Sequence, residues 1–151
     1  MIKYIILFFM VVSSFAKDMQ IYAGYFSYND KTHVSKFTKD VNVTKGEDNI
    51  LANVVYVYLN QDKKLYKLVA IGNVRFHIKD KKNNTYVGNS DRLLYTAPTE
   101  RYTLEGHVHV TKVEVQQELY GKKVIIDKIH GLANVIGGEN APLKFIIKVK
   151  D

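Results

Sequence analysis

The chain has no cysteine and no tryptophan, and it has only two prolines in 151 residues. Without cysteine there is no disulfide framework and no thiolate that could act as nucleophile or metal ligand, so the core alone must hold the fold. With 46% hydrophobic and 25% charged residues, the sequence is typical of a globular protein with one domain.

Acidic residues are fewer than basic ones, and the formal net charge is +7. This excess predicts an anionic partner, but charge alone does not distinguish nucleic acid, a membrane surface and an acidic glycolipid. Tyrosine is abundant at eleven residues, and with Val, Ile, Thr and Phe it favours half-buried strands. Basic charge among tyrosines is also typical of sheets that bind single-stranded nucleic acid. The signal for export that the N-terminal residues carry, described next, argues against nucleic-acid binding.

The N-terminal residues differ in character from the rest. Lys3 precedes a continuous apolar run over 4–12, and the next four residues end in a small-x-small pattern at Ala16. The run is shorter than the roughly 20 residues that a membrane span needs. We therefore interpret residues 1–16 as a signal peptide cleaved after Ala16, and residues 17–151 as the mature domain. The alternative is an uncleaved membrane anchor.

Short runs in the mature chain alternate between apolar and polar residues, as strands with one buried face do. These runs lie at 37–43, 74–79 and 107–111. Polar turn signals separate the runs, at 46–49, 60–64, 79–84, 96–99 and 137–140. The pattern predicts an all-β sandwich, roll or barrel.

An internal repeat underlies these strands. The pair Val41-x-Val43 returns as Val74-x-Phe76 and as Val108-x-Val110, at intervals of 33 and 34 residues. Gly72-Asn73 ahead of the second pair matches Gly106-His107 ahead of the third. Periods of this size predict stacked hairpin-like units. Each unit also has a small residue where we expect the facing sheet or a ligand to come close; these residues are Ala52, Gly88 and Gly121.

Three motif groups extend the repeat over most of the mature chain. They are Ile21-x-Ala23 with Phe37-x-x-x-Val41-x-Val43-x-x-Gly46 and Ile50-x-Ala52-x-x-x-Tyr56; AIGNVRF at 70–76 with YVGNSDRLLY at 86–95; and LEGHVHV at 104–110 with LYGKKVIID at 119–127. From about residue 19 to 130, the sequence resembles the LptA/OstA-like family of periplasmic lipopolysaccharide-transport proteins. It departs from the family pattern at Gly24 and Asn53, where Asp is usual, and at Lys39, where Gly is usual.

The resemblance implies a β-jellyroll, or folded "taco", of stacked short antiparallel strands with an apolar groove. It implies a non-enzymatic carrier of the periplasm, without cofactor, that binds the lipid A acyl chains of lipopolysaccharide and passes them from the inner to the outer membrane. Implied partners are LptC-like and LptD-like proteins, and further copies joined head to tail through edge strands at about 20–27 and 143–149. No nucleic-acid partner is expected. The alternative is an LptC-like or scaffold component that only bridges partners, with or without a membrane anchor.

A carrier needs an apolar trough rather than a nucleophile. One face of each strand points between the sheets, and the resemblance favours a lined groove over a dry, filled core made by the same side chains. The residues that we expect to line this groove are Ile21, Phe37, Val41, Val43, Ile50, Ala52, Val74, Phe76, Ile78, Tyr102, Leu104, Val108 and Val110. Alternation does not decide which face of 50–59 points inward, because both faces are apolar.

Polar candidates are fewer. Lysines in or beside the predicted turns could contact phosphates or simply form a solvated surface; they are Lys63, Lys64, Lys79, Lys81, Lys82, Lys122 and Lys123. His107-x-His109 brings two imidazoles close along one strand, but no third ligand follows from the spacing, so no metal site is predicted. A small hydrolase is the least favoured function, since no carboxylates are paired and no serine elbow is present.

Overall fold

The computed structural model describes residues 19–138 and 142–149, so the predicted signal peptide lies outside the described residues. The strands are β1 (Met19–Tyr22), β2 (Tyr25–Asn29), β3 (Val34–Lys45), β4 (Asp48–Leu59), β5 (Leu65–Lys79), β6 (Thr85–Thr96), β7 (Arg101–Lys112), β8 (Gln117–Asp127), β9 (Leu132–Ile136) and β10 (Lys144–Ile147). A 3₁₀ helix, η1 (Val113–Val115), joins β7 to β8. The described part of the chain contains no helix with the length and apolar character of a membrane span.

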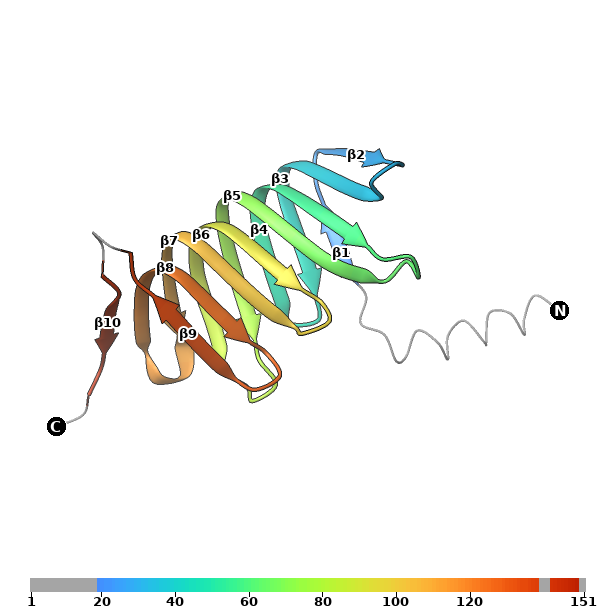
Figure 1. The fold of residues 1–151 in the computed structure, drawn as a ribbon. Coiled ribbons are helices and arrows are strands. Elements are labelled where there is room, and N and C mark those ends of the chain that lie inside the picture. Colours follow the sequence, from blue (N-terminus) through green and yellow to red (C-terminus); the bar gives the residue numbers. More distant parts are fainter. Residues whose placement is uncertain (1–18, 139–141, 150–151) are drawn as a thin grey trace.

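The strands form a single antiparallel sheet that is bent double, so that its two halves face each other as layers (Figure 1). Each long strand from β3 to β8 contributes one half to each layer. The first layer has the order β1-β3-β4-β5-β6-β7-β8-β10, and in the second layer β2 and β9 take the places of β1 and β10. The predicted all-β fold of stacked antiparallel strands is therefore confirmed.

The bend is built from β-bulges, which recur with the period seen in the sequence. The register slips between Thr38 and Val41 in β3, and the same slip recurs in β5 and β7. At each slip, two successive residues have positive φ; they are Lys39 and Asp40, Gly72 and Asn73, and Gly106 and His107. Such a bulge adds a residue and bends the strand. Each apolar pair of the repeat thus begins directly after a bend.

The bend also changes which side chains point inward in the strands that face a bulge and lack its extra residue. In β4, Ile50 and Ala52 are buried before the bend, whereas Val55 and Val57 are buried after it. Across the bend β4 has one residue fewer than β3, so its inner and outer sets exchange, whereas β3 keeps its alternation through the bulge. Both apolar faces of 50–59 are therefore used, one in each layer.

Three sequence predictions need correction. The first turn is shorter than 46–49, because β4 already begins at Asp48. The strand predicted at 20–27 is divided into β1 and β2 at Gly24, whose backbone N–H donates to the carbonyls of Thr38 and Lys39 at the bend of β3. The predicted last strand is reduced to β10, and β9 forms an additional edge that the pattern did not reveal.

The small residues of the repeat allow close approach, but not always of the facing layer. A Cβ on Gly88 would lie 1.9 Å from the carbonyl oxygen of His109 in the neighbouring strand β7. This close neighbour belongs to the same layer, contrary to the prediction. A Cβ on Gly121 would lie 2.8 Å from Cγ1 of Val135, in a strand of the second layer. The prediction therefore holds for Gly121.

Candidate functional site

Two apolar rows run along the interior from one end of the sheet to the other. In the first layer, the strand register places each residue of the following row directly opposite the next: Ile21, Val43, Ile50, Phe76, Gly88, Val110, Leu119 and Phe145. The second layer has a corresponding row, made of Phe26, Phe37, Val55, Ala70, Leu93, Leu104, Val124 and Val135. Directly opposed residues of antiparallel strands share a face. Each row is therefore a stripe that crosses every strand of its layer.

The structure brings the predicted groove residues together between the layers. Eleven of the thirteen belong to the buried hydrophobic cluster, and the other two, Ile21 and Phe37, are partly buried and pack against it. Their role in binding a lipid stays a prediction.

Sequence reasoning missed much of the second layer. Buried residues that it did not name include Val55, Val57, Leu68, Ala70, Leu93, Tyr95, Val124 and Ile126. The repeated Val-x-Val pairs mark only the strand halves that follow a bend in the first layer. The available signal for the second layer was the density of apolar residues in runs such as 54–59.

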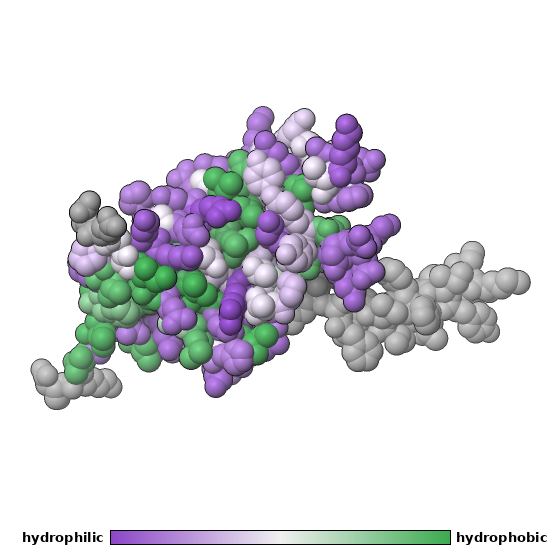
Figure 2. Space-filling view, in the orientation of Figure 1, coloured by the Kyte–Doolittle hydropathy of each residue, from purple (hydrophilic) through white to green (hydrophobic). Residues whose placement is uncertain are grey.

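The middle of the interior is filled by side chains. Side chains such as Val74, Leu93 and Leu104 are 0% exposed, so no space large enough for water adjoins them. An acyl chain could enter this region only if the layers moved apart. At the ends, by contrast, the rows reach solvent: Phe26 is 54% exposed and Phe145 is 44% exposed. Figure 2 shows apolar side chains gathered around the β8–β10 end.

The long edge opposite the bend, which we call the mouth, is formed by loops from both layers. Loops 46–47 and 80–84 belong to the first layer, and turns 97–100 and 128–131 belong to the second. Asp80 shapes loop 80–84: its Oδ1 accepts hydrogen bonds from the backbone N–H groups of Lys82 and Asn84, both at 2.9 Å. These bonds fix the backbone that carries Lys81.

Asp127 shapes the turn on the other side of the mouth in the same way. Its Oδ1 accepts from the backbone N–H groups of Ile129 and His130, both at 3.1 Å, and its Oδ2 lies 2.9 Å from Nδ1 of His130. The side chain and then the backbone N–H of His130 lower the pKa of Asp127 to about 2. The carboxylate is therefore charged at neutral pH and holds the turn that carries Lys128.

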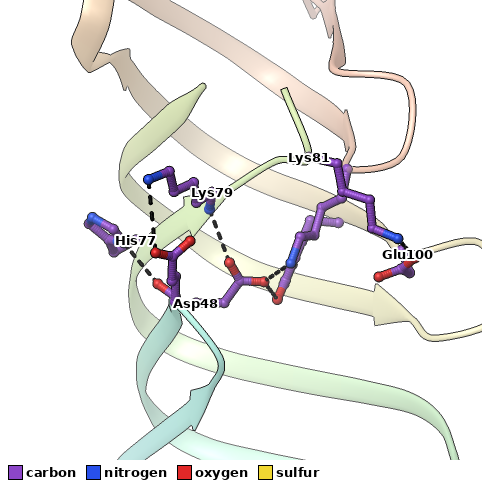
Figure 3. A network of polar contacts seen from close by, with 8 residues as sticks. Asp48, His77, Lys79, Lys81 and Glu100 are labelled. Carbon is purple, nitrogen blue, oxygen red and sulfur yellow. Dashed lines mark hydrogen bonds and ion pairs between the residues drawn. The ribbon is translucent and has the colours of Figure 1, made fainter. Parts of the chain in front are cut away.

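Contacts centred on Asp48 join the layers at the mouth (Figure 3). Asp48, in the first layer, is 3% exposed. Its Oδ2 accepts hydrogen bonds from Nζ of Lys128 at 2.5 Å and from the hydroxyl of Tyr102 at 2.8 Å, both in the second layer. Its Oδ1 accepts from the backbone N–H of Lys79 at 3.0 Å. We call Asp48 and these three donors the Asp48 network.

Further contacts cross the mouth beside this network. The backbone N–H of Lys81 donates to the carbonyl of Lys128 at 2.9 Å, and Nζ of Lys81 lies 3.0 Å from Oε2 of Glu100. Nζ of Lys45 lies 5.7 Å from the centre of the Tyr95 ring, within the range of a cation–π contact. The mouth is thus closed by polar and charged groups over an apolar interior.

Burial raises the pKa values of three tyrosines on this side of the core. Burial, followed by the charge of Asp80, raises the pKa of Tyr86 to about 12. Burial, followed by the charges of Glu100 and Asp48, raises the pKa of Tyr95 to about 12. Burial and then the Asp48 carboxylate raise the pKa of Tyr102 well above its usual value. All three hydroxyls are neutral at physiological pH.

Known proteins share the sequence pattern and the fold of this chain. The family model of LptA and the LptD N-terminal domain, lipopolysaccharide-transport proteins, matches residues 20–131. The chain belongs to this family. Because the match spans most of the chain, the protein is a lipopolysaccharide-transport component and not an enzyme, as the sequence resemblance implies. No curated protein matches the chain.

A solved structure supports the LptA-like fold independently. The protein is similar to LptH, which is described as the LptA-homologous periplasmic component of the lipopolysaccharide transport device of Pseudomonas aeruginosa. The TM-score is 0.77 at 15% identity, over 88% of this chain and 96% of LptH. At this identity, the likeness concerns the fold alone.

The predicted lysines lie in separate parts of this LptA-like protein: Lys63 and Lys64 in the turn 60–64, Lys82 in loop 80–84, and the others as follows. Lys79 and Lys81, which were predicted, line a cavity of about 300 Å³ at the mouth together with Lys45 and Lys128, which were missed. Lys122 and Lys123, predicted to lie by a turn, instead lie within β8 and line a different cavity beside the bend. The mouth lysines could not be grouped from the sequence, because β3, β5 and β8 bring them together only in the folded sheet.

The two histidines of the His107-x-His109 motif serve different neighbours. Nδ1 of His107 lies 2.7 Å from Oδ2 of Asp91 in β6, whereas Nε2 of His109 lies 3.0 Å from Oε1 of Glu118 in β8. The His109 ring also stacks on Tyr120, with ring centres 4.3 Å apart. Over residues 19–138 and 142–149, no three His, Cys, Asp or Glu residues are grouped to hold a metal ion.

Proposed function

We propose that the protein is a periplasmic carrier that shelters the lipid A acyl chains of lipopolysaccharide between its layers and passes them to the next component of the transport route. The observation that carries this proposal is the pair of apolar rows, which cross all strands of both layers and reach solvent at both ends. Acyl chains lying along such rows would meet side-chain carbon on every strand except at Gly88. Family membership supplies the lipopolysaccharide.

The energetics suit reversible transport. Each sheltered methylene contributes about 0.8 kcal/mol, so roughly ten methylenes favour binding by on the order of 8 kcal/mol. The tails must displace contacts between layers that are filled with side chains, and this cost lowers the net affinity. A carrier that hands its cargo on needs such a moderate affinity.

We infer further that copies join end to end, and that LptC-like and LptD-like proteins join in the same way. The edge strands β1 and β2 at one end, and β9 and β10 at the other, leave backbone groups free for strand addition. Joining these edges would continue both apolar rows into the next protein. Cleavage after Ala16, which lies outside the described residues, would deliver the chain to the periplasm.

A scaffold that bridges partners without holding lipid is the second candidate, and the filled interior favours it. Photo-crosslinking in cells distinguishes the two. We expect a photo-reactive residue in place of Phe76 or Val108, which are 3% and 2% exposed, to capture lipopolysaccharide. The same residue in place of Val87, which is 38% exposed, is the control and should not. Adducts with protein alone at the interior positions would reject the carrier and support the scaffold.

A further inference from the structure

The mouth gathers cations around a cavity above the apolar interior. Four lysines and three acidic residues line this cavity of about 300 Å³; they are Lys45, Lys79, Lys81 and Lys128, and Glu47, Asp80 and Glu100. Three of these lysines hold carboxylates: Lys79 with Glu47 at 3.9 Å, Lys81 with Glu100 at 3.0 Å, and Lys128 with Asp48 at 2.5 Å. The cavity therefore offers several ammonium groups whose present partners could be exchanged for another anion.

The strength with which these lysines are held differs. Lys81 and Glu100 are 59% and 27% exposed, so water competes with their ion pair and the pair is weak. Lys128 and Asp48 are 14% and 3% exposed, so neither charge is well hydrated. Breaking a buried pair leaves the remaining charge uncompensated. Lys81 can therefore exchange Glu100 for another anion freely, whereas Lys128 can leave Asp48 only if water then reaches Asp48.

We propose that the mouth is the binding site for the phosphate groups of the glycolipid, and that phosphate binding there opens the two layers. The inference rests on the proposed carrier function and assigns its polar half. A phosphate accepts hydrogen bonds from Lys81 and then from Lys128, because its charge and three oxygens suit two ammonium groups. The acyl chains of the same molecule then lie directly at the apolar rows.

The opening follows from the position of Asp48. Once Lys128 turns to a phosphate, Asp48 keeps only the Tyr102 hydroxyl and the Lys79 backbone N–H as donors. Its charge is then stabilised by water that enters as the layers separate. Because phosphate binds the open state better than the closed state, it shifts the population toward opening. Headgroup binding and tail entry are thereby coupled.

Hydrogen exchange of the Lys81 amide measures this opening, because that N–H donates across the mouth to the Lys128 carbonyl. We expect lipid A with both phosphates to accelerate exchange of this amide about tenfold in the full chain, because it raises the population of the open state, while amides in the centre of β6 and β7 stay protected. Lipid A stripped of its phosphates should bind about tenfold more weakly, the effect of one lost charge-assisted hydrogen bond. It should accelerate the exchange less. Inorganic pyrophosphate alone should have little effect.

A pair of variants with unchanged net charge tests the assigned groups. In D48N/K128M, we expect the Lys81 amide to exchange rapidly without lipid and the preference for phosphorylated lipid A to fall at least about threefold. The control D91N/K122M changes exposed groups near the bend and should keep both properties. Folding of both variants is checked by circular dichroism.

The outcomes separate this inference from the carrier function. Equal acceleration by stripped lipid A or by pyrophosphate would overturn the phosphate-driven opening, as would an unchanged preference in D48N/K128M. Bound phosphorylated lipid A without faster exchange at Lys81 would show that tails enter elsewhere. Binding of neither lipid would reject the carrier function itself, and the mouth site with it.

Discussion

The bend and the mouth are the two long edges of the same folded sheet, and they connect its layers differently. At the bend, the backbone of each strand from β3 to β8 passes from one layer to the other, and β3, β5 and β7 do so through bulges with positive φ. At the mouth, the described contacts are side-chain pairs and the hydrogen bond from Lys81 to Lys128. The bend can therefore be separated only by unfolding strands, whereas the mouth can open by exchanging polar partners.

We expect the largest loss in the free energy of unfolding from a substitution at the mouth. Lys128→Met leaves Asp48, at 3% exposure, without its cation, and should lower the free energy of unfolding by about 3–5 kcal/mol. Urea denaturation measures the loss. The matched variant Lys81→Met removes a more exposed lysine and should cost at most about 0.5 kcal/mol.

The double variant D48N/K128M removes both charges of the buried pair, and it should recover most of the stability lost in Lys128→Met. Equal losses in Lys128→Met and Lys81→Met would mean that the Asp48 network does not hold the mouth closed.

A smaller effect is expected at the bend. Gly106 has φ of +81°, and a Cβ there would lie 2.5 Å from Oδ2 of Asp91. Gly106→Val should lower the free energy of unfolding by about 2–3 kcal/mol, because a β-branched residue is strained at positive φ. Thermal or urea unfolding of Gly106→Val beside the unchanged protein measures this loss.

Position 39 provides the reciprocal control, because a lysine with φ of 69° occupies the same place in the first bulge. Lys39→Gly should raise the free energy of unfolding by about 0.5–1 kcal/mol through relief of this strain. Destabilisation by Lys39→Gly would contradict the assignment of strain to the bulge.

Alkaline pH should weaken the mouth before the bend. The pKa values of Tyr86 and Tyr95 are raised to about 12, so the folded state keeps protons that the unfolded chain loses above about pH 10. Their stabilisation is complete below pH 10 and declines as pH rises toward 12, by on the order of 1 kcal/mol after solvent screening. Urea titrations at several pH values measure the decline. In Y86F/Y95F, the slope should become shallower, and an unchanged slope would assign the pH dependence to other groups.

The smallest effect on stability is expected at the ends of the sheet. β10 pairs with β8 over only four residues, so Ile146→Pro should change the free energy of unfolding by less than about 1 kcal/mol. It should nevertheless reduce concentration-dependent association, because proline removes a backbone donor from the edge. Analytical ultracentrifugation measures the association. Unaltered oligomers would show that this edge is not the joint.

The sequence alone predicted the features that depend on local order. Alternation of apolar residues predicted strands, and the recurrence of Val41, Val74 and Val108 predicted the stacked units and the inward residues of the first layer. Those predictions succeeded because the bulged strands β3, β5 and β7 keep one two-residue alternation through the bend, as from Phe37 to Val41 and from Leu104 to Val108. Family motifs lie along the same local pattern, and this is why the resemblance was visible without a structure.

Only the tertiary structure decided how the layers meet. It assigned the inward faces of 50–59, divided the first strand at Gly24, and brought Asp48 to Lys128 across 80 residues of sequence. Such contacts depend on the angle at which the sheet folds over and on the register of several strands at once. No local period carries that information, so the aspartate that begins β4 and a lysine in the turn after β8 became the buried ion pair of the mouth only when the sheet closed.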